Sequence, residues 1–158
     1  MQQPDSLNQV AEFHRTFHAP ILDSPQIPSD ARAQLRVSLL AEELDELREA
    51  IAEKDLVAVA DALCDLQYVL SGAVLEFGLG DKFKALFDEV QRSNMSKACL
   101  TVAEAEDTVA QYTAKGVACH YIESEGKFLV FRDADHKTLK SIHYSPADLE
   151  GILAVNQT

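Results

Sequence analysis

The stretch LVAVADALCDLQYVLSGAVL, which runs from Leu56 to Leu75, decides the fold because it is almost wholly apolar and yet carries two acids. Apolar side chains on every side of a helix are typical of a helix inside a protein core. Asp61 and Asp65 would each cost about 2.5–3.5 kcal/mol at the centre of a bilayer. We therefore predict a core helix, and not a membrane span, which Asp55 caps and which ends at Gly78 and Gly80.

Further helices are predicted on both sides of this core helix. Each begins at a residue that can cap it and continues with apolar residues at helical spacing. Their predicted ranges are 6–18, 29–54, 81–97 and 101–115.

The pattern changes after residue 116. Two β-prone runs, 117–124 and 128–132, flank Glu125-Gly126-Lys127, which suits a hairpin turn. Residues 146–153 predict a short closing helix with Pro146 at its first position. The predicted fold is mainly α: a four-helix-type bundle over residues 1–98, with a C-terminal extension over 99–158 that packs on the same domain. A small helix and a β-hairpin form that extension.

The composition excludes several classes of partner. Asp and Glu number 26 against 14 Lys and Arg, so the formal charge is −12, which disfavours nucleic acids and anionic membranes. The N-terminus MQQPDSLNQ has neither the basic start nor the apolar core of a signal peptide. Cys64, Cys99 and Cys119 are odd in number and widely spaced, which is typical of free thiols in a reducing compartment. We therefore expect a cytoplasmic protein.

Acidic side chains stand on the inner face of the predicted helix 29–54. At about 100° per residue, Glu43 falls in the middle of the apolar arc formed by the leucines, and Glu46 lies on its edge. A buried carboxylate is disfavoured unless it is paired or bound to a metal. Arg36 stands two turns before Glu43 on the same face, so a buried ion pair is the alternative to a metal site.

Asp61 and Asp65 repeat this conflict in the core helix. They are four residues apart and project from one face, which Tyr68 and Gly72 continue. Like charges at this spacing repel in an apolar setting, and a hard cation such as Mg²⁺ or Mn²⁺ relieves the repulsion with oxygen ligands. Hydrogen bonds inside the core are the alternative. Two helices with two inward acids each favour a metal site, whose candidate ligands are Glu43, Glu46, Asp61 and Asp65.

A basic and amide-rich segment, RSNMSK from Arg92 to Lys97, ends the predicted helix 81–97. The apolar stripe of that helix, when continued, puts Asn94 and Lys97 on its inner side. Such a helix end suits phosphate oxygens, and capping of the helix by its own Lys and Asn is the alternative.

Three of these segments resemble motifs of one enzyme superfamily. LAEELDEL at residues 40–47 resembles the EExxE helix of the all-α nucleoside triphosphate pyrophosphohydrolases, which include MazG-like proteins and phosphoribosyl-ATP pyrophosphohydrolases. DALCDLQY at residues 61–68 is similar to the second motif, usually ExxD, with Ala62 in place of the Glu. FDEVQRSNMSK at residues 87–97 resembles the EVxxSNMSK stretch of a phosphoribosyl-ATP pyrophosphohydrolase-like branch.

The resemblance implies a helical bundle that holds Mg²⁺ through Glu43, Glu46 and Asp65, with Asp61 as the substitute for the missing Glu. It implies a house-cleaning or nucleotide-pool enzyme that cleaves a nucleoside triphosphate between its α and β phosphates to a monophosphate and pyrophosphate. Glu42 or Glu46 is the candidate catalytic base. The candidate substrate-binding residues are Arg36, Tyr68, Arg92, Asn94 and Lys97. We expect a homodimer or homotetramer.

Two other functions stay open at this point. The same chemistry could act on phosphoribosyl-ATP, because these motifs do not specify the base or the sugar. The chain could instead be a non-catalytic acidic helical module that oligomerises or binds a partner helix. In that case Asp61 and Asp65 would pair with basic residues such as Arg36 and Lys97.

Overall fold

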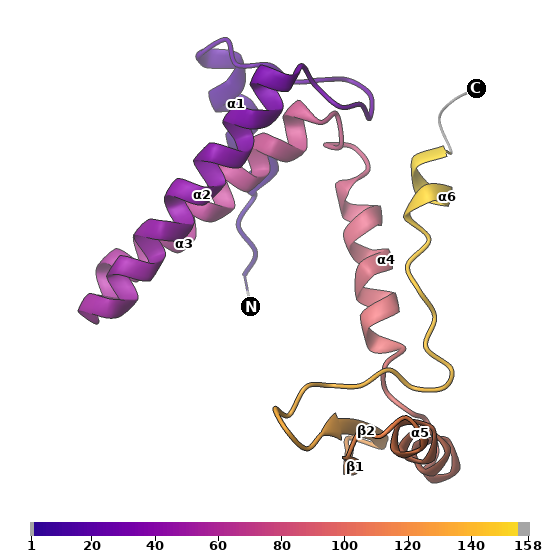
Figure 1. Cartoon of the computed structure of the whole chain (residues 1–158). Coiled ribbons are helices and arrows are strands. Elements are labelled where there is room, and N and C mark those ends of the chain that lie inside the picture. The colour runs from indigo at the N-terminus through magenta and orange to yellow at the C-terminus, as the bar shows by residue number, and fades with distance from the viewer. Residues whose placement is uncertain (1, 155–158) are drawn as a thin grey trace. The chain divides into compact units, whose positions relative to one another are not determined.

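The structure is a computed structural model that describes residues 2–154 (Figure 1). Helices account for 58% of these described residues. Its elements are α1 (Ser6–Thr16), α2 (Asp30–Glu53), α3 (Leu56–Glu76), α4 (Phe83–Met95), α5 (Val102–Ala114), β1 (Cys119–Ser124), β2 (Lys127–Arg132) and α6 (Leu149–Ala154). The predicted mainly α fold with a small hairpin is confirmed.

Contacts between residues divide the chain into two compact units, Met1–Phe83 and Lys84–Thr158, which we describe one at a time. This division falls directly after Phe83, the first residue of α4, whereas the predicted boundary lies after residue 98. The two predicted domains, 1–98 and 99–158, stay a prediction.

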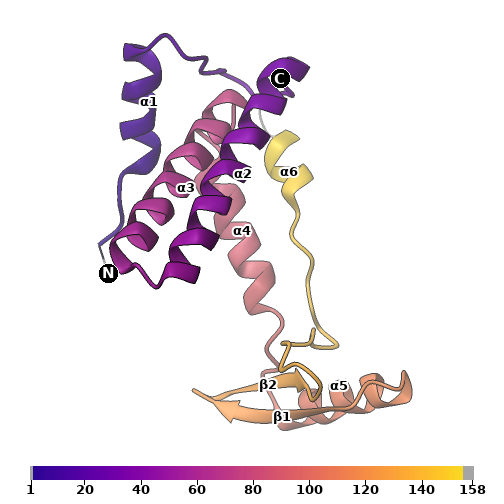
Figure 2. The same cartoon turned by 60° about the vertical axis from the view of Figure 1, so that its left-hand side comes forward.

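In the first unit, α2 and α3 form an antiparallel hairpin (Figure 2). Its turn is short because Lys54 takes the left-handed conformation, with φ of 59°, and ends α2. The Asp55 carboxylate then accepts hydrogen bonds from the backbone N–H groups of Val57 (2.9 Å) and Ala58 (3.1 Å). The predicted cap of the core helix at Asp55 is confirmed, and this tight turn fixes which residues of α2 and α3 face each other.

Helix α1 lies along α3, where the buried side chains of Val10 and Ala11 pack with Leu75. The prediction that Ser6 caps this helix is wrong. Ser6 is its first helical residue, Asp5 holds the N-cap position, and no side chain makes a capping bond there. The Asp5 carboxylate instead accepts a hydrogen bond from the side chain of Asn8 at 2.8 Å.

Glycine ends α3, as predicted. Gly78 has a φ of +67°, and a Cβ atom at this position would stand 1.9 Å from the carbonyl oxygen of Ser24. The connector between α1 and α2 passes here, and its Leu22 N–H donates to the carbonyl of Leu75 at 3.1 Å. A side chain at position 78 would push the connector away, so only glycine fits.

Exposed apolar side chains recur every seven residues on both helices of the hairpin. They are Val37, Leu44 and Ile51 on α2, and Leu56, Leu63 and Leu70 on α3, with exposed fractions from 41% to 79%. Only 22% of the most apolar window of α3 is buried. A seven-residue repeat of apolar side chains is the pattern of a helix that packs against further helices.

Among residues 2–154, α3 alone is long and apolar enough to cross a membrane by length and composition. It also carries Asp61, Asp65 and Glu76, and it packs against α1 and α2. These features fit the predicted core helix of a bundle.

The second unit has its core between α5 and the hairpin β1–β2. The buried residues Cys99, Ala105, Val130 and Leu139 form this core. The strands pair antiparallel from Cys119↔Arg132 to Ser124↔Lys127. Both residues of the turn have positive φ, 50° at Glu125 and 73° at Gly126, as a type I′ turn requires. The predicted hairpin is confirmed.

The closing helix begins later than predicted. We expected it to start at Pro146, but α6 starts at Leu149. The side chain of Asp148 accepts the N–H of Gly151 at 2.8 Å and so caps the helix. The carbonyl of Pro146 is used elsewhere, as the acceptor of a hydrogen bond from Arg92 at 2.9 Å. The hydrogen bond of Arg92 to the Pro146 carbonyl, together with a capping Asp two residues further on, explains the later start.

Candidate functional site

Glu43 is the central residue of the candidate site. It lies half-buried on α2, on the side that faces α3. Its pKa is raised above the usual value of a glutamate, first by burial and then by the negative charges of Glu46, Asp65, Glu42 and Asp61, in that order. The fold therefore brings the four predicted metal ligands and both candidate bases close enough to interact electrostatically.

The register of the hairpin explains this meeting. Gly72 on α3 lies against Arg36 on α2, since a Cβ atom on Gly72 would stand 2.7 Å from Nη1 of Arg36. In an antiparallel pair, seven residues forward along α2 and seven residues back along α3 reach the same level. These steps lead from Arg36 to Glu43 and from Gly72 to Asp65, so the two acids lie opposite each other.

The carboxylates fit Mg²⁺ in their chemistry. Within residues 2–154, no three His, Cys, Asp or Glu side chains are grouped so that they could hold one metal ion together. Mg²⁺ does not need such a cage, because it keeps several waters and commonly takes only one or two protein carboxylates along with substrate phosphates. Glu42, Glu46 and Asp61 are exposed, so their side chains can rotate toward a cation. Mutual repulsion around Glu43 is the charge pattern that a cation relieves.

Arg36 is buried, but the alternative of an Arg36–Glu43 ion pair is wrong. Arg36 forms an ion pair with Glu76, the last residue of α3. Arg32, one turn earlier on α2, also binds Glu76, with its Nε 2.9 Å from Oε2. The carboxylate of Glu76 is wholly buried, and the two guanidinium groups neutralise it. A contact between Arg36 and substrate stays a prediction.

The sequence did not predict the network around Glu76, because Glu76 follows directly after the apolar stretch 56–75 in which inward acids were sought. Glu76 follows Gly72 at a spacing of four, so it continues the face that carries Asp65. This spacing was the available signal. Burial acts to raise the pKa of Glu76, but hydrogen bonds from Arg32 and Arg36 outweigh burial and hold the pKa below the usual range.

His14 on α1 completes this network. Its Nδ1 donates to the carbonyl oxygen of Pro20 at 2.8 Å, since a carbonyl can only accept. Its Nε2 is thereby left as an acceptor, 3.5 Å from Nη2 of Arg36. The side chain of His14 is 2% exposed, so it ties α1 to the α2–α3 hairpin at the level of Gly72.

Tyr68, a predicted substrate-binding residue, stands at the edge of the carboxylate group. It lies on the same helix as Asp65, and its ring is 40% exposed. The ring of Phe13 on α1 meets it edge-on, with 5.7 Å between centroids, and Phe17 lies 4.4 Å beyond Phe13. These three rings form an exposed aromatic group beside the acids.

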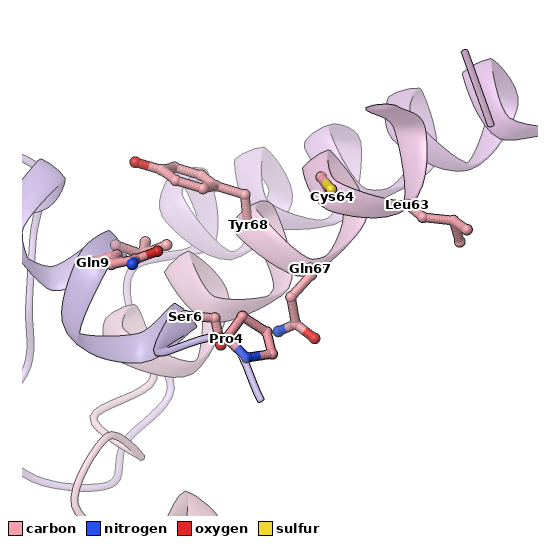
Figure 3. Close-up of a pocket in the computed structure, with 8 residues that line it drawn as sticks. Pro4, Ser6, Gln9, Leu63, Cys64, Gln67 and Tyr68 are labelled. Atoms are coloured by element: carbon pink, nitrogen blue, oxygen red, sulfur yellow. The ribbon is translucent and has the colours of Figure 1, made fainter. Parts of the chain in front are cut away.

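A pocket of about 420 Å³ lies next to Tyr68 (Figure 3). Its wall comes from the start of α1 and the residues before it on one side, and from α3 on the other. The lining residues are Pro4, Ser6, Gln9, Val10, Leu63, Cys64, Gln67 and Tyr68. The sequence did not predict this pocket, because its shape depends on how α1 lies against α3.

The predicted phosphate-binding residues Arg92, Asn94 and Lys97 lie in the second unit. Arg92 binds both carboxylate oxygens of Glu89, at 2.8 and 2.7 Å, and holds the pKa of Glu89 at about 2. The ammonium of Lys97 donates to the side-chain carbonyl of Asn94 at 2.8 Å. In the structure these groups are partnered within their own unit, so their contact with phosphate stays a prediction.

The SNMSK stretch also holds the segment that precedes α6. Ser93 is buried and donates to the hydroxyl of Tyr144 at 3.1 Å. The backbone N–H of Ser145 donates to the hydroxyl of Ser96 at 2.9 Å. Ser93 and Ser96 therefore hold the segment before α6 against α4.

Comparison with known proteins identifies the family. A relative from Acanthamoeba polyphaga mimivirus, an uncharacterized protein, is 32% identical over an alignment of 97 residues. This alignment covers 56% of this chain and 37% of the relative's length. The chain thus spans little more than a third of that relative. The family model of phosphoribosyl-ATP pyrophosphohydrolase matches residues 10–94, more than half of the chain, and this match includes every helix that contributes to the carboxylate group. The chain belongs to the phosphoribosyl-ATP pyrophosphohydrolase family.

Proposed function

We propose that the chain is a Mg²⁺-dependent nucleoside triphosphate pyrophosphohydrolase, which cleaves the bond between the α and β phosphates. The observation that carries this proposal is the raised pKa of Glu43 among four other carboxylates on two facing helices. Membership of a pyrophosphohydrolase family supports the reaction class and a nucleotide-type substrate. The cation and the triphosphate are the parts that this proposal adds.

Glu43, Glu46, Asp61 and Asp65 would hold the cation, for which Mg²⁺ is the first candidate and Mn²⁺ the second. When bound, it supplies charge neutralisation at the phosphate oxygens and makes a water more acidic. All four ligands are oxygen donors, as a hard cation requires.

The chain's own residues would activate and orient water. Glu42 or Glu46, both exposed, would accept a proton from the attacking water. The water oxygen forms a bond to the α phosphorus while the bond from that phosphorus to the α–β bridging oxygen breaks. Pyrophosphate leaves with the electron pair of that bond, and the nucleoside monophosphate remains. We propose that Arg92, Asn94 and Lys97 are phosphate-binding residues.

A panel of common and modified nucleoside triphosphates, assayed with Mg²⁺ for pyrophosphate and for phosphate, tests this function. Pyrophosphate and a monophosphate in equal amounts are the expected products. Phosphate as the main product would refute cleavage between the α and β phosphates. An inactive panel would favour the non-catalytic helical module.

Phosphoribosyl-ATP is the second candidate substrate, because the matching family model carries that description. It belongs in the same panel. A kcat/KM for phosphoribosyl-ATP that exceeds the value for every triphosphate would assign the chain to that substrate, since the ratio of these values measures preference.

The raised pKa of Glu43 predicts opposite pH effects with and without metal. In the metal-free protein, protonation of Glu43 stabilises the fold, and this stabilisation is complete when the pH lies below the usual pKa of a glutamate. It is lost as pH rises through the raised pKa of Glu43, so the free energy of unfolding falls. A cation binds the deprotonated form. Mg²⁺ should therefore raise the melting temperature by a few degrees at about pH 7.5 and by less at about pH 5. A non-catalytic module without a cation site predicts no shift in a thermal unfolding assay at either pH.

We also propose that a second copy of the chain covers the apolar repeat on α2 and α3. Side chains repeated every seven residues on both helices can interlock with the same repeats of another hairpin to form a four-helix bundle. The wild-type chain of 17.4 kDa should then have the mass of two or four copies in light scattering.

Leu44→Glu should break this assembly, because it puts a charge into an apolar seam. Ala52→Glu is the matched control, since Ala52 is an exposed residue of α2 outside the repeat. We expect the mass of a single chain for L44E and the wild-type mass for A52E. A wild-type protein that is monomeric, or an L44E protein that still assembles, would contradict the proposal.

A further inference from the structure

We propose that the pocket between α1 and α3 binds the nucleobase of the substrate. This inference rests on the proposed function and deepens it, because it assigns the part of the nucleotide that the acidic motifs leave open. It covers a purine or pyrimidine base on a sugar phosphate, whether the substrate is a triphosphate or phosphoribosyl-ATP.

The size of the pocket suits such a ligand. Its volume of about 420 Å³ falls in the range of about 300–1,000 Å³ that small-molecule sites occupy. Pro4 and Val10 supply apolar walls, and a few polar groups stand among them. Apolar walls with a small number of polar groups are the usual lining of a site for a flat organic ring.

The polar groups of the pocket match the edge of a base. Gln9 on α1 and Gln67 on α3 each offer an amide, which both donates and accepts hydrogen bonds (Figure 3). Gln67 Nε2 donates to the hydroxyl of Ser71 at 3.1 Å, which orients the amide and leaves its carbonyl oxygen as an acceptor. Base edges also present donors and acceptors side by side.

The aromatic group at the rim supplies a stacking surface. Tyr68 lines the pocket, and its ring is held edge-on by Phe13 at 5.7 Å. Tyr68, Phe13 and Phe17 are 40%, 42% and 66% exposed, although aromatic rings gain stability from burial. Exposed rings beside a pocket with apolar walls and a few polar groups offer a platform on which a base can stack.

One wall of the pocket adjoins the carboxylates. Tyr68, which lines the pocket, stands three residues after Asp65 on α3, a spacing at which helical side chains are neighbours. A base in the pocket would thus direct its sugar and α phosphate along α3 toward Asp61 and Asp65.

Binding of nucleoside monophosphates without metal tests this inference apart from hydrolysis. The probes are the 5′-monophosphates of adenosine, guanosine, cytidine and uridine, titrated in EDTA and followed by saturation-transfer NMR. We expect at least one of them to bind with stronger saturation of base protons than of ribose protons. Absence of binding for all four, or saturation confined to the ribose, would overturn the inference.

Two variants locate the binding in the pocket. Gln9→Leu removes one amide from an exposed position, and Cys64→Phe fills the pocket. We expect Q9L to weaken Kd about two- to tenfold, the range for one hydrogen bond, and C64F to weaken it at least as much. Gln34→Leu on α2, outside the pocket, is the matched control and should leave Kd unchanged. Circular dichroism checks folding, and Q9L decides the outcome if C64F does not fold.

The same variants separate failure of this inference from failure of the proposed function. In a wild-type enzyme that hydrolyses triphosphates, Q9L should raise KM or change the base preference with little change in kcat. Unchanged KM and preference in both pocket variants would overturn the base site while the function stands. A wild type without hydrolysis, whose monophosphate binding is weakened in Q9L, would refute the function and support the site.

Discussion

Glu43→Gln should abolish pyrophosphate release while the protein stays folded. Glu43 is the carboxylate on which the charges of Glu46, Asp65, Glu42 and Asp61 converge, and its amide counterpart cannot bind a cation as an anion does. Groups outside a metal's ligand shell commonly contribute about 10–100-fold to activity, so a ligand should contribute more than about 100-fold in kcat/KM. Steady-state assay of pyrophosphate measures this loss.

The stability of E43Q should not fall with its activity. The substitution removes one negative charge from a group of like charges, so the metal-free variant should be as stable as the wild type or more stable near neutral pH. Glu49→Gln, an exposed residue of the same helix, is the control and should change neither property. Loss of activity together with retained stability assigns Glu43 to function. Undiminished hydrolysis in E43Q would show that Glu43 is not part of the catalytic site.

Glu76→Gln should be the most destabilising single polar change in the first unit. Glu76 is wholly buried and neutralises Arg32 and Arg36, so its replacement leaves the buried Arg36 without a counter-charge. Loss of one partner of a buried ion pair costs about 3–5 kcal/mol. Urea unfolding of E76Q against wild type measures this loss, and Glu12→Gln, exposed on α1, is the control.

A second variant separates charge from shape. Arg36→Met in the E76Q background removes the uncompensated buried charge, while Arg32, whose side chain is 34% exposed, can turn to water. The double variant should recover part of the lost stability. No recovery would mean that packing and not charge explains the effect.

The pH dependence of this contribution follows from the lowered pKa of Glu76. A carboxylate whose pKa falls on folding stabilises the native state above its unfolded pKa, near 4.3, and the contribution is lost as pH falls through the folded value. The difference between wild type and E76Q should therefore be full at neutral pH and shrink only in acid.

Local signals predicted most helices correctly. Asp55 caps α3 as its carboxylate and position suggested, and Thr101 begins α5 because its hydroxyl accepts the N–H of Glu104 at 3.2 Å. In each case the interaction lies within one turn of the chain, so the residue type alone contains the information.

The carboxylate group was also predictable, because helical periodicity placed Glu43 and Asp65 on the inner faces of their helices. The partner of Arg36 was not, since an arginine reaches acids on more than one turn. Glu43 and Glu76 both lie within the set of acids on that seam, and only the register of the hairpin selects Glu76. Which acid of the neighbouring helix lies opposite Arg36 depends on the tertiary structure and not on local sequence.

The pocket and the start of α6 depended on contacts that no local pattern contains. The pocket needs Gln9 and Gln67 to face each other across two helices. The start of α6 depends on Arg92, which binds the Pro146 carbonyl from a position 54 residues away in the chain. Such interactions form only when the fold does.

The contact at Gly72 has a consequence for engineering the enzyme. Any side chain at this position would put a carbon atom 2.7 Å from Nη1 of Arg36 and 3.1 Å from Nε2 of His14, so these two side chains would have to move. Because Arg36 is a buried partner of Glu76, their movement would disturb that ion pair. Position 72 therefore offers a way to weaken the buried ion pair of the first unit without replacing any charged residue.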